Sequence, residues 1–250
     1  MDDFSLLIDL HRTNSRQGPG GDAETELALR LCRLDPQAPV KVADIGCGTG
    51  ASTLGLARLM PNARIVAADF LKDFLDLLED NASKAGVAER IETLACAMEE
   101  LPFEEEQFDL IWSEGAIYNM GFEAGLKAWR RFLKPGGVLA VSEITWLTGT
   151  RPDEIEAHWT REYPEIDMAS AKMRVLERQG YSPIGYLTLP EHCWLDNYYR
   201  PIQDRLPEFL SRHNHSSDAE AIANAEQQEI ALYEKHKAHY SYGFYIAQRV

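Results

Sequence analysis

Short apolar runs alternate with amphipathic segments through the middle of the chain. The runs are predicted to be β-strands, and they lie at residues 40–45, 64–68, 90–95, 108–112 and 138–142. Between them, apolar residues recur at intervals of three and four, as in residues 71–78, which is typical of a helix with one buried face. Strands that alternate with single helices favour a parallel sheet covered by helices on both faces.

The flanking segments are less regular and are predicted to cap this core. We expect a helix at 168–179, a sixth strand at 181–189 and a seventh at 240–250. The predicted fold class is α/β: a doubly wound, Rossmann-like, mostly parallel seven-stranded sheet with helical cap insertions. We expect one domain, residues 1–250, whose parts are an N-terminal helical cap (1–35), a cofactor-binding core (36–145), two helical lid insertions (146–167 and 191–240) and the last strand (240–250).

Composition and charge narrow the possible partners. The 250 residues include 25 Lys and Arg against 40 Asp and Glu, a formal net charge of −15. A large nucleic-acid groove or a site for an anionic membrane needs a basic face, so neither partner is expected. Residues 1–21 lack the basic start and apolar stretch of a signal peptide, and no apolar run is long enough to span a membrane. We therefore expect a cytoplasmic protein.

The cysteine and histidine patterns do not predict a metal site. The four cysteines are far apart and form no CxxC pair, so a disulfide framework or a structural zinc site is not expected. His213 and His215, like His236 and His239, have possible ligand spacings, but no cysteine accompanies them. The expected metal content is none.

A glycine-rich segment follows the first predicted strand and precedes the first helix. It comprises residues 44–50, with the sequence DIGCGTG. Glycines at this point allow a tight turn and a close approach of a ligand to the backbone, in the crevice beyond the carboxyl ends of the strands. Asp69 ends the second strand, where its carboxylate can accept both hydroxyl groups of a ribose. As an alternative, Asp69 only caps the following helix.

The glycines alone leave two classes of cofactor open. Gly46, Gly48 and Ala51 also fit the fingerprint of a dinucleotide site, which predicts an NAD(P)-dependent oxidoreductase with a pyrophosphate at the helix N-terminus. Asp44 disfavours this alternative, because a carboxylate two residues before the first glycine does not suit a pyrophosphate. It suits the ammonium group of an amino acid.

Five ordered motifs together resemble those of a known family. They are DIGCGTG (44–50), Asp69, ELPF (100–103), FDLI (108–111) and LKPGG (133–137). This series resembles the class I S-adenosylmethionine-dependent methyltransferases, and most of all the small-molecule group that includes the ubiquinone/menaquinone C-methyltransferases. The resemblance is strong over residues 36–145 and specific for fold and cofactor, whereas the substrates of the family vary widely.

The resemblance implies a set of cofactor-binding residues. Gly46, Gly48 and Gly50 would line the methionine part of S-adenosylmethionine, with Asp44 near its ammonium group. The remaining contacts implied are Asp69 on the ribose, Phe70, Met98 and Glu99 around adenine, Ser113 at the methionine pocket, and Arg16 or Gln17 near the methionine carboxylate. Ala97 stands where family members often carry an aspartate, so a side-chain contact to the adenine amino group is not expected.

Two groups of residues are candidates for the acceptor side. Glu114 and Tyr118 follow the fourth strand and are the candidate catalytic residues. Aromatic and histidine side chains near the caps are candidates for substrate binding: His11, Trp146, His192, Trp194 and Tyr198. Aromatic faces stabilise cations, although the same residues also suit the packing of a lid onto a sheet.

The predicted function is transfer of a methyl group from S-adenosylmethionine to a small molecule, with S-adenosylhomocysteine as the other product. The expected caps favour a small acceptor, and the exposed aromatic caps permit a homodimer. The sequence does not indicate whether carbon, nitrogen, oxygen or sulfur is methylated, nor whether a general base is used. A non-catalytic S-adenosylmethionine-binding protein is the second alternative, because these motifs serve binding rather than transfer.

Overall fold

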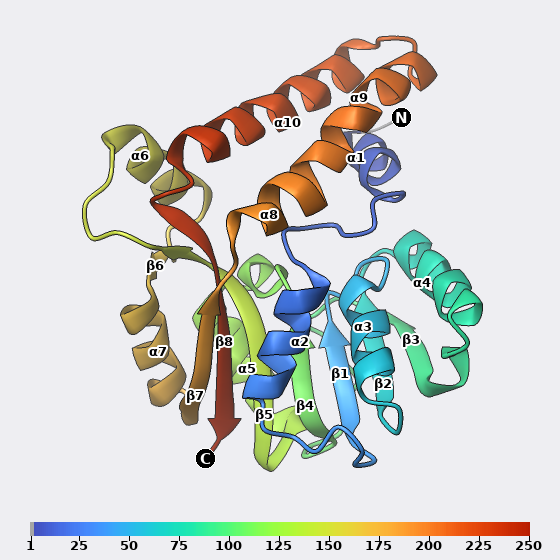
Figure 1. Ribbon diagram of the computed structural model, residues 1–250, viewed down its shortest axis with the longest axis vertical. Coiled ribbons are helices and arrows are strands. Elements are labelled where there is room, and N and C mark those ends of the chain that lie inside the picture. Colours follow the sequence, from blue (N-terminus) through green and yellow to red (C-terminus); the bar gives the residue numbers. More distant parts are fainter. Residues whose placement is uncertain (1–2) are drawn as a thin grey trace.

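A twisted sheet runs through the middle of the computed structural model, which describes residues 3–250 (Figure 1). Met1 and Asp2, with which the expected N-terminal cap begins, lie outside the described residues. Helices cover both faces of the sheet, and a further layer of helices lies beyond the end at which the parallel strands finish (Figure 1).

The predicted α/β core is confirmed. Within the described chain the sheet has eight strands, in the order β3-β2-β1-β4-β5-β8-β7, with the short β6 beside the end of β5. Strands β1 to β5 are parallel, whereas β8 runs antiparallel to both β5 and β7. Their bounds are β1 (Lys41–Ile45), β2 (Arg64–Asp69), β3 (Ile91–Ala95), β4 (Phe108–Ser113), β5 (Leu133–Trp146), β6 (Asp167–Met168), β7 (Tyr181–Thr188) and β8 (Tyr240–Arg249).

Strand β5 is much longer than the apolar run at 138–142 predicted. Beyond Ser142, the last residue of the predicted run, the strand continues to Trp146 through Glu143 and Thr145. Both of these residues are polar but fully buried. These residues interrupt the apolar pattern, and the strand persists because β8 pairs with it from Val138 to Trp146. The two-residue β6 is likewise too short to produce a periodic signal.

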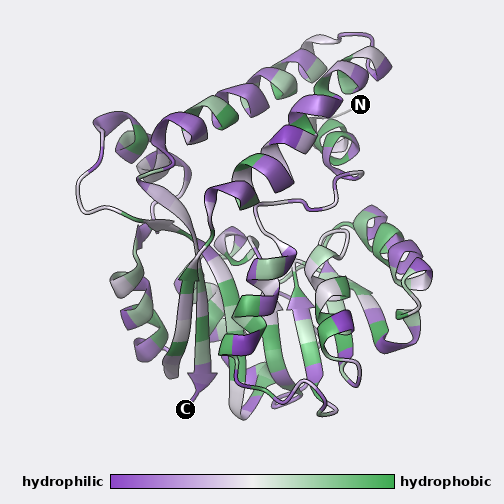
Figure 2. Cartoon of the chain, in the orientation of Figure 1, coloured by the Kyte–Doolittle hydropathy of each residue, from purple (hydrophilic) through white to green (hydrophobic). Residues whose placement is uncertain are grey.

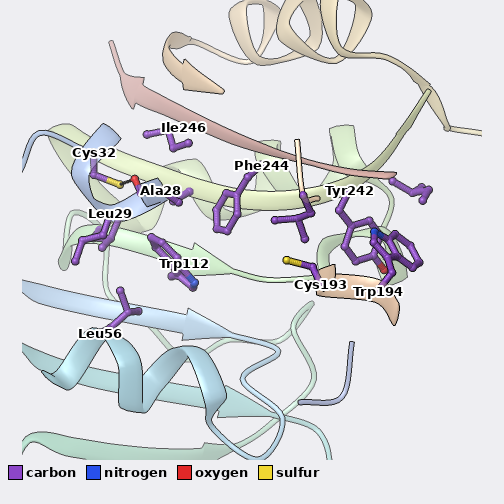
Figure 3. Close-up of a cluster of buried hydrophobic side chains, with 14 of the residues drawn as sticks. Ala28, Leu29, Cys32, Leu56, Trp112, Cys193, Trp194, Tyr242, Phe244 and Ile246 are labelled. Atoms are coloured by element: carbon purple, nitrogen blue, oxygen red, sulfur yellow. Dashed lines mark hydrogen bonds between the residues drawn. The ribbon is translucent and has the colours of Figure 1, made fainter. Parts of the chain in front are cut away.

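Alternate residues of the strands face two separate apolar layers. On one face, helices α2 (Asp22–Leu31) and α3 (Ala51–Leu59) pack on residues such as Val42 and Leu110. Figure 3 shows part of this layer, with Ala28 and Leu29 of α2, and Cys32 directly after it, beside Trp112 and Phe244. On the other face, α5 (Phe122–Trp129) and α7 (Ala169–Arg178) cover Ala43 and Ile111. Helix α4 (Lys72–Lys84) packs against β2 and β3.

The remaining helices form the cap. They are α1 (Asp3–His11), α6 (Asp153–Glu162), α8 (Glu191–Trp194), the π-helical turn η4 (Leu195–Tyr199), α9 (Arg200–Arg212) and α10 (Ser217–His236). Apolar residues of α1, α9 and α10 form their own small core, which includes Leu10, Leu206 and Phe209. Hydrophilic residues are more frequent in these helices than in the central strands (Figure 2). Of the expected N-terminal cap, only α1 lies here, because α2 packs on the sheet.

No helix among residues 3–250 combines the length and the apolar character needed to cross a membrane.

Candidate functional site

The glycine-rich turn after β1 forms one wall of a cavity at the carboxyl ends of the strands. Gly46 and Gly48 line it and have φ angles of 74° and 55°, in the left-handed region that favours glycine. A Cβ atom at Gly46 would lie 2.3 Å from Cβ of Ala116, so no side chain fits there. Gly50 does not line the cavity; it precedes α3, and a Cβ there would meet Leu78 at 2.1 Å.

Asp44 lies behind this turn rather than in the cavity wall. Its side chain is fully buried, and its Oδ2 accepts hydrogen bonds from Thr53 Oγ1 at 2.6 Å and Ser52 Oγ at 3.0 Å. Its other oxygen, Oδ1, has no hydrogen-bond partner among the described residues. Burial raises the pKa of Asp44 to about 7, although the two hydroxyl groups oppose the shift. The carboxyl group therefore has one oxygen left for a cationic group next to the turn.

Asp69 lies at the end of β2 and lines the cavity. Its Oδ2 accepts a hydrogen bond from the Gly48 N–H at 2.8 Å, and its Oδ1 accepts one from the Leu71 N–H at 2.9 Å. Burial raises the pKa of Asp69, and these backbone donors partly oppose the rise. A carboxylate has about four acceptor sites, so each oxygen can still accept a hydroxyl group. Asp69 thus binds two backbone N–H groups and keeps acceptor sites for a ligand, whereas the N-cap residue of helix α4 is Leu71.

The side of the cavity beyond Asp69 is apolar. Phe70 lines it with 69% of its surface exposed, so its ring is free to pack against a ligand. Cys96, Ala97, Met98 and Glu99, after β3, form the opposite wall. The predicted residues Phe70, Met98 and Glu99 are therefore together in one cavity with Asp69.

The segment between α1 and α2 closes the cavity from the cap side. Gln17 lies over the glycine-rich turn, where its Oε1 accepts hydrogen bonds from the backbone N–H and the hydroxyl group of Thr49 at 3.0 and 2.7 Å. Its Nε2 donates to the carbonyl oxygens of His11 and Asn14. The buried Arg16 forms ion pairs with Glu114 and with Asp22, each at 3.0 Å. Residues 16–19 all line the cavity.

Glu114 is the centre of a hydrogen-bond network that joins this segment to the sheet. One carboxylate oxygen accepts from Arg16, and the other accepts from Thr25 Oγ1 at 2.8 Å and Trp112 Nε1 at 3.0 Å. Three donors hold the carboxylate in place at the cavity wall. This geometry suits a positioning group better than a mobile proton acceptor.

The other predicted residues are distributed between the cavity and the protein core. Tyr118 lines the cavity, and 40% of its surface is exposed. Ser113 is fully buried and does not line it. Among the substrate candidates, Trp146 and Trp194 are core residues, and Trp194 stacks on Tyr233 with ring centres 4.5 Å apart.

His11, His192 and Tyr198 also lie outside the cavity lining. His11 stacks on Tyr198, with ring centres 6.2 Å apart, and forms a 3.0 Å hydrogen bond with Glu226 of α10. His192 is exposed and lies 3.3 Å from Glu24. Glu24, His192 and Cys193 bring three possible metal ligands within 4.8 Å of one another, a juxtaposition that no local spacing indicates. The expectation that the protein holds no metal therefore stays a prediction.

Sequence reasoning missed several polar residues near the cavity. Glu143 and Lys172 form a fully buried ion pair at 3.0 Å. Burial raises the pKa of Tyr118, and the charge of Glu229 in α10 raises it further. Glu143 and Lys172 are 29 positions apart, and Tyr118 and Glu229 are more than 100 apart, so no local motif joins either pair. The only available signal was the density of tyrosines in the last strand and the second lid insertion.

The cavity fits an adenosylated amino acid. Its volume is about 600 Å³, within the usual range of small-molecule sites, and it lies where the strand order reverses between β1 and β4. Asp69 offers acceptors for hydroxyl groups, Phe70 contributes an apolar side chain to the lining, and the buried carboxyl group of Asp44 lies behind the glycine-rich turn. These are the kinds of groups that the ribose, the adenine and the ammonium group of S-adenosylmethionine require.

Comparisons with known proteins agree with this geometry. Residues 42–137 match a family model described as a methyltransferase domain. The chain is 35% identical over 123 residues to the methyltransferase GfsG of Streptomyces halstedii, which covers 48% of this chain and 43% of that protein. It is 30% identical over 145 residues to a demethylmenaquinone methyltransferase of Clavibacter sepedonicus, a match that covers 58% of this chain and 56% of that protein. The matches thus span about half the length of these curated relatives.

The similarity in fold covers nearly the whole chain. A crystal structure of an S-adenosylmethionine-dependent methyltransferase from Geobacter sulfurreducens, in complex with S-adenosyl-L-homocysteine, superposes with a TM-score of 0.82. The match covers 99% of this chain and 98% of that one at 17% identity. The family model, the motifs and the strand order agree, and they set the dinucleotide alternative aside. Residues 42–137 therefore form a methyltransferase domain, with the motifs and the strand order of the class I S-adenosylmethionine-dependent methyltransferases.

Proposed function

We propose that the protein transfers a methyl group from S-adenosylmethionine to a small-molecule acceptor. The observation that carries the proposal is the placement of the glycine-rich turn and Asp69 in one cavity that the segment 16–19 closes. When bound there, S-adenosylmethionine supplies a methyl group on a positively charged sulfur atom, which a nucleophile displaces in line. The residues of this chain bind the reactants, align them for the displacement and shield them from water.

The chain's own residues have distinct proposed roles. Asp69 binds the ribose hydroxyl groups, Asp44 faces the ammonium group, and Phe70, Met98 and Glu99 surround the adenine. Glu114 holds Arg16 and thereby the closing segment, which excludes water from the reactants. Tyr118 forms the wall of the cavity on the acceptor side.

A small acceptor agrees with the architecture. The cap helices lie over the carboxyl ends of the strands (Figure 1), and the net charge of −15 disfavours nucleic acid as a substrate. A cytoplasmic location and a homodimer stay predictions from the sequence.

Incubation with methyl-labelled S-adenosylmethionine tests the proposal. We expect the purified protein to move label into the low-molecular-weight fraction of a cell extract and to release S-adenosylhomocysteine. Label that appears only in protein or RNA would contradict a small acceptor. Tight binding of S-adenosylhomocysteine without transfer in any fraction would favour the alternative of a non-catalytic binding protein. The Asp69→Ala variant is the negative control, since it is expected to bind the cofactor poorly and to transfer little label.

The buried carboxyl group of Asp44 gives a second test, on the cofactor site alone. With a pKa of about 7, Asp44 is mostly protonated at pH 6. An ammonium group beside it favours the ionised form, so binding of S-adenosylhomocysteine at pH 6 is expected to release close to one proton. The release should fade as the pH rises above 7, where Asp44 is already ionised in the free protein.

Calorimetric titration in buffers with different ionisation enthalpies measures this proton release. The Asp44→Asn variant is the control, since it keeps the shape of the side chain but has no proton to lose. If the binding enthalpy at pH 6 is the same in every buffer, Asp44 does not face the ammonium group.

A further inference from the structure

Three side chains with metal-ligating atoms meet where the cap joins the layer of helices on the sheet. Glu24 lies in the first turn of α2, and His192 and Cys193 lie in the short helix α8. One carboxylate oxygen, one imidazole nitrogen and the sulfur atom of these residues lie within 4.8 Å of one another, and we call the three residues the α2–α8 cluster. None of them belongs to the described lining of the cofactor cavity, so the cluster is a separate feature of the molecule.

The spacing of the three ligand atoms is close to what one tetrahedral zinc ion requires. Zinc bonds to oxygen, nitrogen and sulfur are about 2.0–2.3 Å long, so two ligand atoms of a tetrahedral ion lie about 3.3–3.8 Å apart. Glu24 Oε1 and His192 Nε2 are already 3.3 Å apart. Because all three ligand atoms lie within 4.8 Å, a closure of at most about 1 Å completes three bonds to one ion.

The Glu24 carboxylate gives independent evidence for a partner at this point. Its Oε2 is inaccessible to solvent and has no hydrogen-bond partner among the described residues. No lysine or arginine of the described chain forms an ion pair with Glu24, whose ionic contact is with His192. Buried polar atoms nearly always have a partner, so an orphaned carboxylate oxygen beside a thiol and an imidazole indicates a cation.

The set of ligands selects zinc among the common metal ions. A thiolate and an imidazole suit zinc, whereas magnesium and calcium prefer oxygen ligands. With one thiolate, one carboxylate and one neutral imidazole, the site has no net charge, which suits two buried ligands. Cys193 releases its proton to the solvent when the Zn–S bond forms, and a water molecule completes the tetrahedron. The exposed His192 lies on the side from which the ion enters.

The α2–α8 cluster is connected to the segment that closes the cofactor cavity. The Gly20 N–H donates to the carbonyl oxygen of Cys193 at 3.3 Å, and a Cβ atom at Gly20 would lie 2.8 Å from Nη1 of Arg16. In the first turns of α2, Thr25 donates to the Glu114 carboxylate, which also holds Arg16. An ion that joins α8 to α2 therefore also restrains the closing segment.

We propose that Glu24, His192 and Cys193 bind one zinc ion, which joins the cap to α2 and stabilises the segment between α1 and α2 over the cofactor cavity. Metal binding at this site does not depend on the proposed function. The sequence predicts no metal because its histidine and cysteine spacings are local, whereas Glu24 lies more than 160 positions before His192.

Cobalt(II), a coloured substitute for zinc, tests the thiolate ligand in the full chain. A bond between a thiolate and cobalt produces a charge-transfer absorption that imidazole and carboxylate ligands do not produce. We expect one equivalent of cobalt to produce this absorption, zinc to remove it by displacement, and Cys193→Ser to abolish it. Cys96→Ser is the matched control: it removes a more accessible free thiol outside the cluster and should keep the absorption.

Calorimetric titration with zinc chloride tests the other ligands without replacing a buried cysteine. Partners that only orient a metal ligand change affinity about 10–100-fold, so the loss of a ligand itself should weaken zinc binding by at least about 100-fold. We expect this loss in His192→Ala, which changes an exposed side chain and leaves the fold intact, and in Glu24→Gln. His215→Ala removes another exposed histidine and should bind zinc as the parent does.

The inference is overturned if cobalt produces no thiolate absorption, if the absorption persists in Cys193→Ser, or if His192→Ala binds zinc as tightly as the parent. Zinc should also tighten the binding of S-adenosylhomocysteine by at least about fivefold, and equal affinities with and without zinc would overturn the effect on the closing segment. Failure of S-adenosylhomocysteine to bind under any condition would contradict the proposed function and leave the metal titrations valid.

Discussion

Replacement of Asp69 by alanine is expected to weaken the binding of S-adenosylhomocysteine by at least about 100-fold. The carboxylate is the only acidic group placed for both ribose hydroxyls in the described lining of the cavity, since Glu114 is occupied by three donors and Glu99 lies after β3. Each hydrogen bond to a charged group contributes about 1.5–3 kcal/mol, and two are lost together. Calorimetric titration measures the change directly.

The loss must be separated from damage to the glycine-rich turn, because Asp69 also accepts the Gly48 and Leu71 N–H groups. A ligand without the ribose 2′-hydroxyl group makes this separation. If Asp69 binds the ribose, the alanine variant should lose much less affinity for the 2′-deoxy ligand than for the parent one. Asp73→Ala removes an exposed carboxylate four residues away and is the matched control for charge. Equal losses for both ligands would contradict the ribose assignment.

The core of the fold could be predicted because its strands are buried on both faces and carry almost no polar residues. The hydrophobic pattern does not predict the strand correctly where buried residues are polar. Glu143 and Thr145 extend β5 beyond the predicted end at Ser142 although they are polar, because both are fully buried and their backbone pairs with β8. From the hydrophobic pattern alone such polar residues are predicted to lie in a loop. Only the pairing with a strand that is distant in sequence shows that they belong to β5.

The cofactor side of the site could be predicted because its residues follow strand ends in chain order. The acceptor side could not, because its contacts join segments far apart in sequence. Arg16 reaches Glu114 across 98 positions, and His11 reaches Glu226 across 215. The aromatic residues of the second lid insertion illustrate the ambiguity: Tyr198 stacks on His11 of α1, whereas Trp194, four residues earlier, is stacked in the core. Both residues are aromatic and occur in the same short segment, so the sequence alone does not show which of them is a core residue. Only the three-dimensional packing does.

Replacement of Lys172 by methionine is expected to destabilise the protein by about 3–5 kcal/mol, the usual effect of removing one partner of a buried ion pair. Lys172 Nζ lies 3.0 Å from Glu143 Oε1, with both side chains almost inaccessible to solvent. The same nitrogen lies over the rings of Phe122 and Tyr163, at 4.6 and 5.2 Å from their centres. The variant leaves Glu143 charged and without a cation in the central sheet. For a protein of this size the melting temperature should fall by roughly 6–20 °C.

The pH dependence distinguishes this effect from a simple packing defect. Burial already raises the pKa of Glu143 above its ordinary value of 4.5, while Lys172 opposes the rise. Without Lys172 the pKa in the folded state rises further, so the variant is least impaired below pH 4.5, where Glu143 is protonated in both states. The deficit should grow as the pH increases from 4.5 to 8, because ionisation then favours the unfolded state.

Thermal and urea unfolding across this pH range measure the deficit, with two further variants as controls. Lys127→Met removes an exposed lysine of α5 without an ion pair in the described structure and should change stability by less than about 0.5 kcal/mol. The double variant Glu143→Gln with Lys172→Met removes the unpaired charge. It should be more stable at pH 8 than Lys172→Met alone and nearly independent of pH. If the single and double variants unfold alike at every pH, the charge of Glu143 is not what Lys172 stabilises, and the lysine contributes only its hydrocarbon chain to the packing.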